Sequence, residues 1–390
     1  MERALFAVPR MIHPAVSGGE ARVLGLLKPL ARRWKVTVAT FGEPGAEKEQ
    51  AAAALDLEAR TGIKTLLVPR TPGAAAKADP SLPEIARSHR DPAMEEALAA
   101  AAKDADVAVL EFTQMLQYGR RLASLVPVVA VEHDAGILSP ERSYLRGAGA
   151  EESRKAADYL RRELASCRLV VALCGEDARL LAPLAGTAPV RVVPSGVDLA
   201  GLPWKGAEGR DRRSVVFVGH YPHFPNEDAA VFLATEVMPA LRRRVPGARL
   251  TLVGSRPTPA VKALASADVE VTGTVPSVKP FLDRAGVFVA PLRLGRGLKG
   301  KVLEAFAAGV PVAATPAACE GIPGAEDGKT ALVARDAEAL AAAAERLLTD
   351  GPLAERLSRA ARGLVEERYT CELQSGVLDA VLREALGARA

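Results

Sequence analysis

Residues 286–315 read GVFVAPLRLGRGLKGKVLEAFAAGVPVAAT, and their pattern predicts a strand, a loop, a helix and a second strand. The apolar runs at 286–291 and 311–315 have the composition of buried strands. The segment between them opens with a glycine-rich loop and continues with a helical pattern. Such a β-α-β unit builds a parallel sheet, so the stretch predicts an α/β domain.

The same alternation extends in both directions along the chain. Short β-rich runs are separated by longer amphipathic stretches, which is typical of β-α units that build parallel sheets. The expected strands are 3–8, 35–41, 64–69, 106–112, 127–133, 168–174 and 189–194, then 214–219, 249–254, 269–273, 286–291, 311–315 and 331–334. The last part of the chain, from about residue 336, has a helical pattern throughout.

A charged segment divides the two series of strands. KGAEGRDRR (205–213) has no apolar periodicity and is interpreted as a linker. A chain of 390 residues fits two domains of about 150–200 residues each. We therefore expect two α/β domains in tandem, each with a mainly parallel sheet. The expected limits are 1–204 for the first domain, 205–213 for the linker, 214–368 for the second domain and 369–390 for a terminal helix.

The composition excludes several classes of protein. A net charge of +4, interspersed along the chain, is too small for a nucleic-acid interface. The N-terminus carries Glu2 and reaches Pro9 after a short apolar run, unlike a signal peptide, and no apolar run of about 18 residues follows. We expect a cytoplasmic protein with at most a peripheral membrane contact. Four cysteines form no C-x-x-C pair and are expected as reduced, structural thiols: Cys167, Cys174, Cys319 and Cys371.

Ligands of parallel sheets bind beyond the carboxyl ends of the strands, so residues that follow strands are candidates for a site. Gly18 and Gly19 follow the first strand and precede a helix expected from about Glu20, where free backbone N–H groups favour an anion or a sugar hydroxyl. His133 follows the strand at 127–133 and can hydrogen-bond a substrate hydroxyl. An ordinary glycine loop and a surface histidine are the alternatives.

Two histidines follow the strand that ends at Gly219. His220 and His223 lie in GHYPHFPNED, where Asn226 is expected as the N-cap of the next helix. Their spacing is compatible with a metal ion, but no third ligand is near and prolines keep the loop unhelical, so no metal site is expected. The acid pair of DADV (104–107) precedes a strand, and we interpret it as a turn between a helix and that strand.

The glycines at 295, 297 and 300 spell G-x-G-x-x-G, the pattern of a dinucleotide-binding turn. Glu320 lies where such a site would place its ribose-binding acid. Three features argue against this interpretation. The unit lies in the middle of its domain, its turn is rich in arginine and lysine, and Glu304 lies close enough to the loop to share its ligand.

The same loop fits a nucleoside diphosphate better. Lys299 and Lys301 at a glycine-rich helix start would neutralise a diphosphate, and Glu304 one turn further on could accept hydrogen bonds from both ribose hydroxyls. No metal is needed for this arrangement. The alternative is a solvated basic helix start, which glycines would only destabilise.

Four segments together resemble bacterial glycosyltransferases of GT-B family 4. They are PLRLGRGLKGKVLEAFAAGVPVAAT (291–315), VVPSGVD (192–198), FVGHYPHFPNEDAAVFL (217–233) and GGEARV (18–23). The resemblance implies a GT-B fold, in which two Rossmann-like domains face each other across a cleft. It further implies a retaining transfer in which the second domain holds the nucleotide-sugar donor and the first domain holds most of the acceptor.

The resemblance also implies a set of site residues. His133 corresponds to the histidine that contacts the transferred sugar, and we expect it to be the catalytic residue. Glu304 corresponds to the glutamate that binds the donor ribose, and backbone groups near Val275 are expected to recognise the base. The expected donor-binding residues are Gly18, Gly19, Gly219, His220, Val275, Arg296, Gly297, Leu298, Lys299, Lys301 and Glu304.

Two departures from the family pattern bear on the sugar and on activity. The first glutamate of the family's E-x7-E pattern is replaced by Arg296, and the basic pair that follows the second domain's first strand is replaced by Gly219, His220 and Asn226. Two other functions stay open. A GT-B sugar-nucleotide epimerase would need cleft carboxylates, for which Glu111, Glu132 and Asp134 are the candidates, and a non-catalytic nucleotide-sugar binding protein would need no turnover.

The expected partners are small molecules and glycans. We expect a UDP- or GDP-sugar as donor, no cofactor and no metal. The acceptor would be a glycan, a lipid-linked sugar or a small hydroxyl compound of bacterial polysaccharide, lipopolysaccharide or glycolipid assembly. A basic amphipathic helix expected at 151–167 could face a membrane-bound acceptor, or could simply pack on its sheet.

Overall fold

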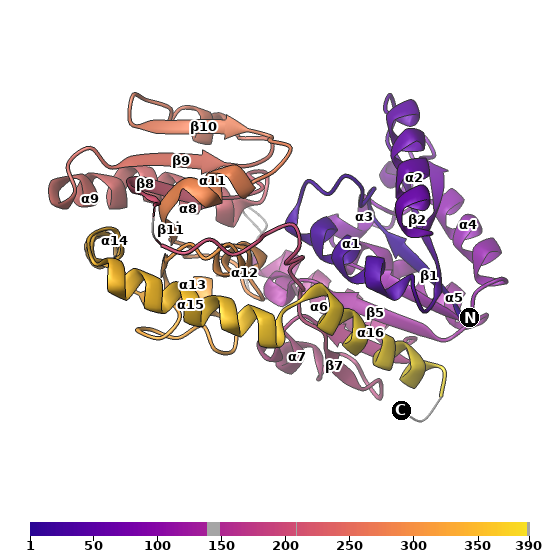
Figure 1. The fold of residues 1–390 in the computed structure, drawn as a ribbon. Coiled ribbons are helices and arrows are strands. Elements are labelled where there is room, and N and C mark those ends of the chain that lie inside the picture. The colour runs from indigo at the N-terminus through magenta and orange to yellow at the C-terminus, as the bar shows by residue number, and fades with distance from the viewer. Residues whose placement is uncertain (139–148, 208, 388–390) are drawn as a thin grey trace.

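The computed structural model describes residues 1–138, 149–207 and 209–387. The chain forms two lobes, each built on a parallel sheet with helices on its faces, and the last two long helices run from one lobe to the other (Figure 1). The α/β alternation predicted from the sequence is therefore confirmed in both halves of the chain.

The first sheet has seven parallel strands in the order β3-β2-β1-β4-β5-β6-β7. Its register pairs Phe6 with Val38 and Ala7 with Leu110. Alternate residues of β1 enter two separate cores: Leu5 faces one side of the sheet and Phe6 the other. The strands are β1 (Arg3–Val8), β2 (Lys35–Gly42), β3 (Lys64–Pro69), β4 (Val107–Glu111), β5 (Val128–Glu132), β6 (Leu169–Ala172) and β7 (Val190–Val192).

Helices cover both faces of this sheet because each contributes one apolar side. The helix α6 shows this: Ala156, Tyr159, Leu160 and Leu164 point into the core, so its apolar face packs on the sheet. The helices are α1 (Gly18–Leu30), α2 (Glu47–Thr61), α3 (Glu84–Arg87), α4 (Pro92–Ala102), α5 (Gly119–Ala123), α6 (Ala150–Leu164) and α7 (Gly175–Leu181), with the 3-10 turns η1 (Ala75–Lys77), η2 (Thr113–Tyr118) and η3 (Ala135–Leu138).

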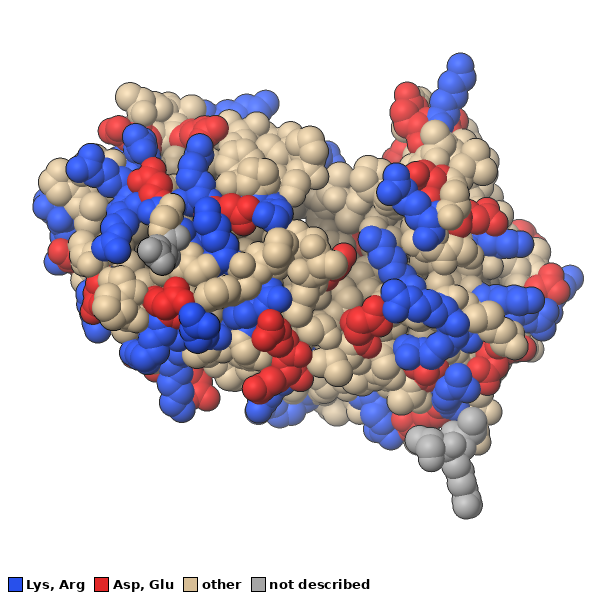
Figure 2. All heavy atoms as spheres, viewed as in Figure 1, with Lys and Arg blue, Asp and Glu red and all other residues tan. Residues whose placement is uncertain are grey.

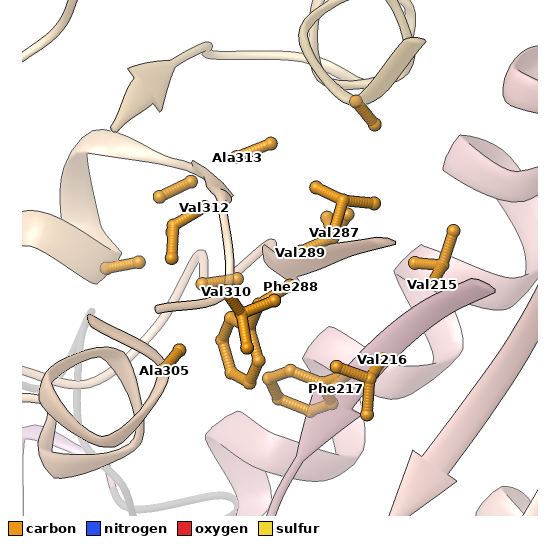
Figure 3. Close-up of a cluster of buried hydrophobic side chains, with 14 of the residues drawn as sticks. Val215, Val216, Phe217, Val287, Phe288, Val289, Ala305, Val310, Val312 and Ala313 are labelled. Atoms are coloured by element: carbon orange, nitrogen blue, oxygen red, sulfur yellow. The ribbon is translucent and has the colours of Figure 1, made fainter. Parts of the chain in front are cut away.

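The second sheet has six parallel strands in the order β10-β9-β8-β11-β12-β13. The central strands are buried on both faces, and Phe217 of β8 packs beside Phe288 of β11 with ring centroids 6.2 Å apart (Figure 3). The strands are β8 (Asp211–Val218), β9 (Arg249–Val253), β10 (Val269–Gly273), β11 (Ala285–Ala290), β12 (Val312–Ala314) and β13 (Leu332–Val333).

The helices of the second half surround this sheet and then return to the first. They are α8 (Phe224–Phe232), the π-helix η5 (Leu233–Val237), α9 (Met238–Arg244), α10 (Pro259–Lys262), α11 (Lys279–Arg284), α12 (Gly300–Ala307), α13 (Pro316–Cys319), α14 (Ala337–Thr349), α15 (Gly351–Arg368) and α16 (Cys371–Ala385). No helix in the described parts of the chain is long and apolar enough to cross a membrane.

The chain passes between the lobes at two neighbouring places. Val193 belongs to a core of the first lobe, whereas Val197 belongs to the core of the second. On the way back, α15 packs in the second core and α16 in the first, against α1. The two passages are tied together, since Val197 N donates to Tyr369 O (2.7 Å) and Cys371 N donates to Val197 O (3.1 Å). The segment 205–213 lies after the first passage, and its last three residues belong to β8.

Each sheet has one point where its strand order reverses. In the first sheet this point lies between β1 and β4, and in the second between β8 and β11. Open α/β sheets bind ligands beyond the carboxyl ends of such strand pairs. Loops from these ends of the two sheets meet, because Ser255 Oγ, after β9, donates to Val16 O, after β1 (2.9 Å).

Candidate functional site

The first side of the site is the start of α1. Ser17 is the N-cap, and it forms a capping box in which its hydroxyl accepts from Glu20 N while Glu20 Oε2 accepts from Ser17 N. The helix therefore begins at Gly18, two residues earlier than we expected. Gly18 and Gly19 form its first turn, with their backbone N–H groups at the positive end of the helix dipole.

His133 lies beside this turn, directly after β5. Its ring stacks on Phe112 with centroids 3.6 Å apart and an interplanar angle of 17°. A Cβ atom added to Gly19 would lie 2.8 Å from the Phe112 ring and 3.7 Å from His133 Nδ1. Only glycine at position 19 therefore lets the start of α1 approach this pair of rings.

The buried side chain of Glu111 contacts the opposite edge of the His133 ring. His133 Nε2 lies 2.5 Å from Glu111 Oε2, and Arg22 Nη1 donates to the same oxygen at 3.3 Å. Burial alone would raise the pKa of Glu111, but Arg22 and His133 outweigh it and lower this pKa. Burial lowers the pKa of His133, which favours the neutral imidazole.

The glycine-rich loop after β11 forms the opposite side of the site. Gly295 and Gly297 have φ values of 81° and 73°, which explains the first two glycines of the motif. A Cβ atom on Gly297 would also lie 2.8 Å from Asp177 Oδ2 of the first lobe. Around Gly300, by contrast, nothing lies within 4 Å of such an atom.

Lys301 and Glu304 lie at the start of α12 and are half-buried. Burial lowers the pKa of Lys301 to about 7, and the neighbouring Lys299 acts in the same direction. Burial raises the pKa of Glu304 to about 7 against the opposing effect of Lys301. Lys301 Nζ also donates to Asn226 Oδ1 of α8.

Two further basic residues of the loop, Lys299 and Arg296, point elsewhere. Lys299 is the N-cap residue of α12, and its Nζ donates to the carbonyl oxygens of Arg296 and Gly297. Arg296 Nη1 lies 3.8 Å from Glu320 Oε1. Glu320, the residue that a dinucleotide site would use for a ribose, is thus close enough to Arg296 for an ion pair.

His220 lies between the two lobes, after β8. Its Nδ1 is 2.7 Å from Ser255 Oγ, and since the serine directs its single proton to Val16 O, His220 must be the donor. Burial lowers the pKa of His220 to about 4, with Arg10, Arg256 and Lys301 adding to this effect. His220 is therefore neutral at neutral pH.

The start of α8 differs from our expectation. The helix begins at Phe224 with His223 as its N-cap residue, because Pro225 falls in the first turn, where a proline costs no hydrogen bond. Asn226 lies inside the helix, and its Nδ2 donates to His220 O at 2.9 Å. The expectation that Asn226 is the N-cap is therefore wrong. Within the ranges that the structure describes, no cluster of three histidine, cysteine or acidic residues could hold a metal ion.

The remaining predicted donor-binding residues, Leu298, Gly219 and Val275, lie in the second domain. Leu298 packs against the cores of both lobes, so it lies at their junction. Gly219 directly follows β8 and lies next to Asn226, and Val275 is half-buried after β10. The acid pair of DADV forms a turn before β4, in which Asp106 accepts from Arg3 N at 2.8 Å.

Sequence reasoning missed several residues of the site. Arg22 and Phe112 were not singled out, and Glu111 was considered only as an acid for an epimerase. Glu111 and Phe112 end a predicted strand, which is the signal that could have found them. No sequence signal distinguishes Arg22 from other helical arginines. Asp177 was also missed, although it faces the glycine-rich loop.

The surface between the two lobes is hollowed, as the space-filling view shows (Figure 2). The first lobe contributes the start of α1 and His133 to the candidate site, and the second lobe contributes the glycine-rich loop with half-buried Lys301 and Glu304.

Comparisons with known proteins agree with this architecture. The sequence profile described as Glycosyltransferase Family 4 matches residues 16–200, and the profile described as Glycosyl transferases group 1 matches residues 212–350. The chain belongs to the family 4, group 1 glycosyltransferases. No protein with a curated function matches its sequence.

Solved GT-B structures share the fold of this glycosyltransferase over its whole length. HepE from Anabaena in complex with UDP-glucose has 16% identity and a TM-score of 0.72, covering 98% of this chain and 100% of HepE. Sucrose-phosphate synthase from Thermosynechococcus elongatus has 18% identity and a TM-score of 0.77, covering 100% of both chains. A TarM mutant from S. aureus, in a complex that contains UDP, has 10% identity and a TM-score of 0.74, again over 100% of both chains.

The expectation of a GT-B fold in family 4 is therefore confirmed. The residue roles that the resemblance implied stay predictions, which the geometry above makes testable.

Proposed function

We propose that this glycosyltransferase moves a sugar from a nucleoside-diphosphate sugar to a hydroxyl acceptor with retention of configuration and without a metal ion. The observation that carries the proposal is the start of α12, where half-buried Lys301 and Glu304 lie beside a glycine-rich loop. A lysine and a helix start suit a diphosphate, and a carboxylate suits two ribose hydroxyls.

The two sides of the candidate site suggest how the donor would lie and which bonds would change. The donor would lie with its nucleotide on α12 and its sugar towards His133 and the start of α1. The bond from the anomeric carbon to the diphosphate oxygen breaks, a bond to the acceptor oxygen forms, and the acceptor proton passes to the departing diphosphate. Side chains of this chain would then bind and orient, and none would act as a nucleophile.

UDP is the first candidate for the nucleotide and GDP the second. HepE, with which this chain shares its fold, was crystallised with UDP and with UDP-glucose. The acceptor would be a sugar, lipid-linked or otherwise, of polysaccharide, lipopolysaccharide or glycolipid assembly.

The epimerase interpretation finds less support in the geometry. Glu132 is 0% exposed and accepts from Thr113 Oγ1 at 2.7 Å. Glu111 is 1% exposed and is held by Arg22 and His133. An epimerase needs a carboxyl group that reaches the sugar and exchanges a proton with it, and both of these carboxyl groups are buried and already bonded.

A thermal-shift panel tests the donor site. We expect UDP or GDP to raise the melting temperature of the wild type in the presence of EDTA, because binding to the native state alone stabilises it. Glu304→Gln should weaken that nucleotide about 10-fold to 100-fold through lost charged hydrogen bonds. Glu367→Gln, an exposed residue of α15, is the matched control and should change nothing. Stabilisation by NAD or NADP alone would overturn the proposal.

Turnover is tested with UDP-glucose and GDP-sugars. His133→Ala should leave the Kd for the nucleotide within about twofold and lower kcat by about 10-fold or more, because it removes a contact with the sugar alone. The anomeric signal of the product in proton NMR reports retention or inversion directly. An inverted product would contradict the retaining mechanism, and a normal kcat would remove His133 from the site.

A further inference from the structure

The contacts of His133 bear on which ring nitrogen carries its proton as well as on where the ring lies. Its ring has two contacts, both from the end of β4: Nε2 meets Glu111 and one face stacks on Phe112. On the side of Nδ1 lies Gly19 at the start of α1, where an added Cβ atom would be 3.7 Å from this nitrogen. A histidine with these contacts cannot rotate or flip without losing at least one of them.

The contact with Glu111 determines which nitrogen carries the proton. Glu111 is ionised, because Arg22 donates to its Oε2 and holds its pKa down. An ionised carboxylate only accepts hydrogen bonds, so His133 Nε2 must be the donor. In a neutral imidazole Nδ1 is then the acceptor, and no hydrogen bond to it comes from the described residues.

Arg22 is itself held in place. Its Nη2 donates to Val193 O at 3.1 Å, and the side chain is 2% exposed. The chain of contacts therefore runs from the backbone beside the first passage between lobes, through Arg22 and Glu111, to His133. Phe112, which stacks on His133, has a strained backbone, since its φ of 73° lies in the left-handed region that a phenylalanine rarely adopts. Strained residues of this kind concentrate at functional sites.

We propose that Glu111, oriented by Arg22, is a positioning residue that holds His133 as the Nε2–H tautomer and presents Nδ1 to the cleft as a hydrogen-bond acceptor. This inference rests on the proposed function for its meaning, because the acceptor would receive a hydroxyl of the transferred sugar. Glu111 acts through His133 and touches no substrate. The tautomer can be observed without any substrate at all.

Nitrogen NMR of the wild type tests the tautomer directly. A two-bond 1H–15N correlation spectrum distinguishes protonated from unprotonated ring nitrogens, and comparison with His133→Ala identifies the signals of this one histidine among five. We expect His133 at pH 7 to show a protonated Nε2 and an unprotonated Nδ1. A protonated Nδ1, or a rapid mixture of both tautomers, would overturn the proposal whether or not the protein turns over any sugar.

Kinetics with the active protein supply the second readout. Glu111→Gln can donate to His133 Nε2 and so favour the other tautomer, and we expect kcat to fall at least about 10-fold while the Kd for the nucleotide stays within about twofold. Glu111→Asp keeps a carboxylate and should recover part of the lost kcat. An unchanged kcat in Glu111→Gln refutes the positioning role. If the wild type neither binds a nucleotide nor turns over, the proposed function fails, and the tautomer measurement still decides this inference.

Discussion

Glu132 should make the stability of this protein fall as the pH rises. The side chain is 0% exposed, Oε2 accepts from Thr113 Oγ1, and Oε1 is buried with no hydrogen-bond partner in the described part of the chain. Burial raises the pKa of Glu132 from 4.5 to about 8, and the nearby charges of Asp134 and Asp177 add to the shift. The native state therefore binds a proton that the unfolded state releases.

The sign of the effect follows from this linkage. The folded pKa lies above the unfolded one, so the stabilisation is fully present below about pH 4.5 and is lost as the pH rises towards 8. The rise of this pKa from 4.5 to about 8 corresponds to a loss of roughly 5 kcal/mol across that window. Glu132→Gln mimics the protonated acid and can still accept from Thr113, so its stability should not fall in this way.

Urea unfolding at pH 5, 7 and 9, followed by circular dichroism, measures the difference. We expect the wild type and Glu132→Gln to have similar midpoints at pH 5 and the variant to be more stable at pH 9. Glu58→Gln, on the exposed side of α2, controls for the loss of a carboxylate and should follow the wild type. Parallel pH profiles for the wild type and Glu132→Gln would refute the reasoning, because they would mean that Glu132 has the same pKa in the folded and unfolded states.

Three glycine substitutions test the packing of the site. Gly19→Ala would place a Cβ atom 2.8 Å from the Phe112 ring, so it should cost about 1–3 kcal/mol and lower turnover. Gly18→Ala meets nothing within 4 Å, so its melting temperature should match the wild type; an equal loss of stability in both variants would contradict the contact. Gly254→Ala would place a Cβ atom 1.8 Å from Gly219 O at a φ of 147°, so it should yield little soluble protein, and a normal melting temperature would contradict the close approach of these two loops.

Most of the fold could be predicted because the strands are short and buried on both faces. A run such as 285–290 is apolar from end to end, and that local pattern predicts a central strand of a parallel sheet without knowledge of its neighbours. The starts of helices were harder to predict because they depend on single side chains. The helix α1 begins two residues before the predicted start because Ser17 caps it, and α8 begins before Asn226 because Pro225 is tolerated in a first turn.

The sequence indicated candidate site residues where one segment carries them, and not where several segments meet. Lys301 and Glu304 share one helix turn with the glycine loop, so their spacing alone indicated an anion and a ribose. The partners of His133 lie elsewhere in the sequence: Glu111 is 22 residues away, and Arg22 is 89 residues from Glu111. A pattern within one segment carries no information on such contacts, because only the order of the strands in the sheet brings them together.

The junction where the chain passes between the two lobes is tightly packed around Cys371. A Cβ atom on Gly196 would lie 2.6 Å from Cys371 Cα, and one on Gly25 would lie 2.7 Å from Cys371 Sγ. The passage of the chain from the first lobe and the start of α16 are therefore packed against α1 with no spare room. The helix α1 begins at Gly18 and Gly19, so the same helix that packs at Cys371 also carries the turn beside His133. The packing at Cys371 thus helps to fix the position of α1 relative to the passage between the two lobes.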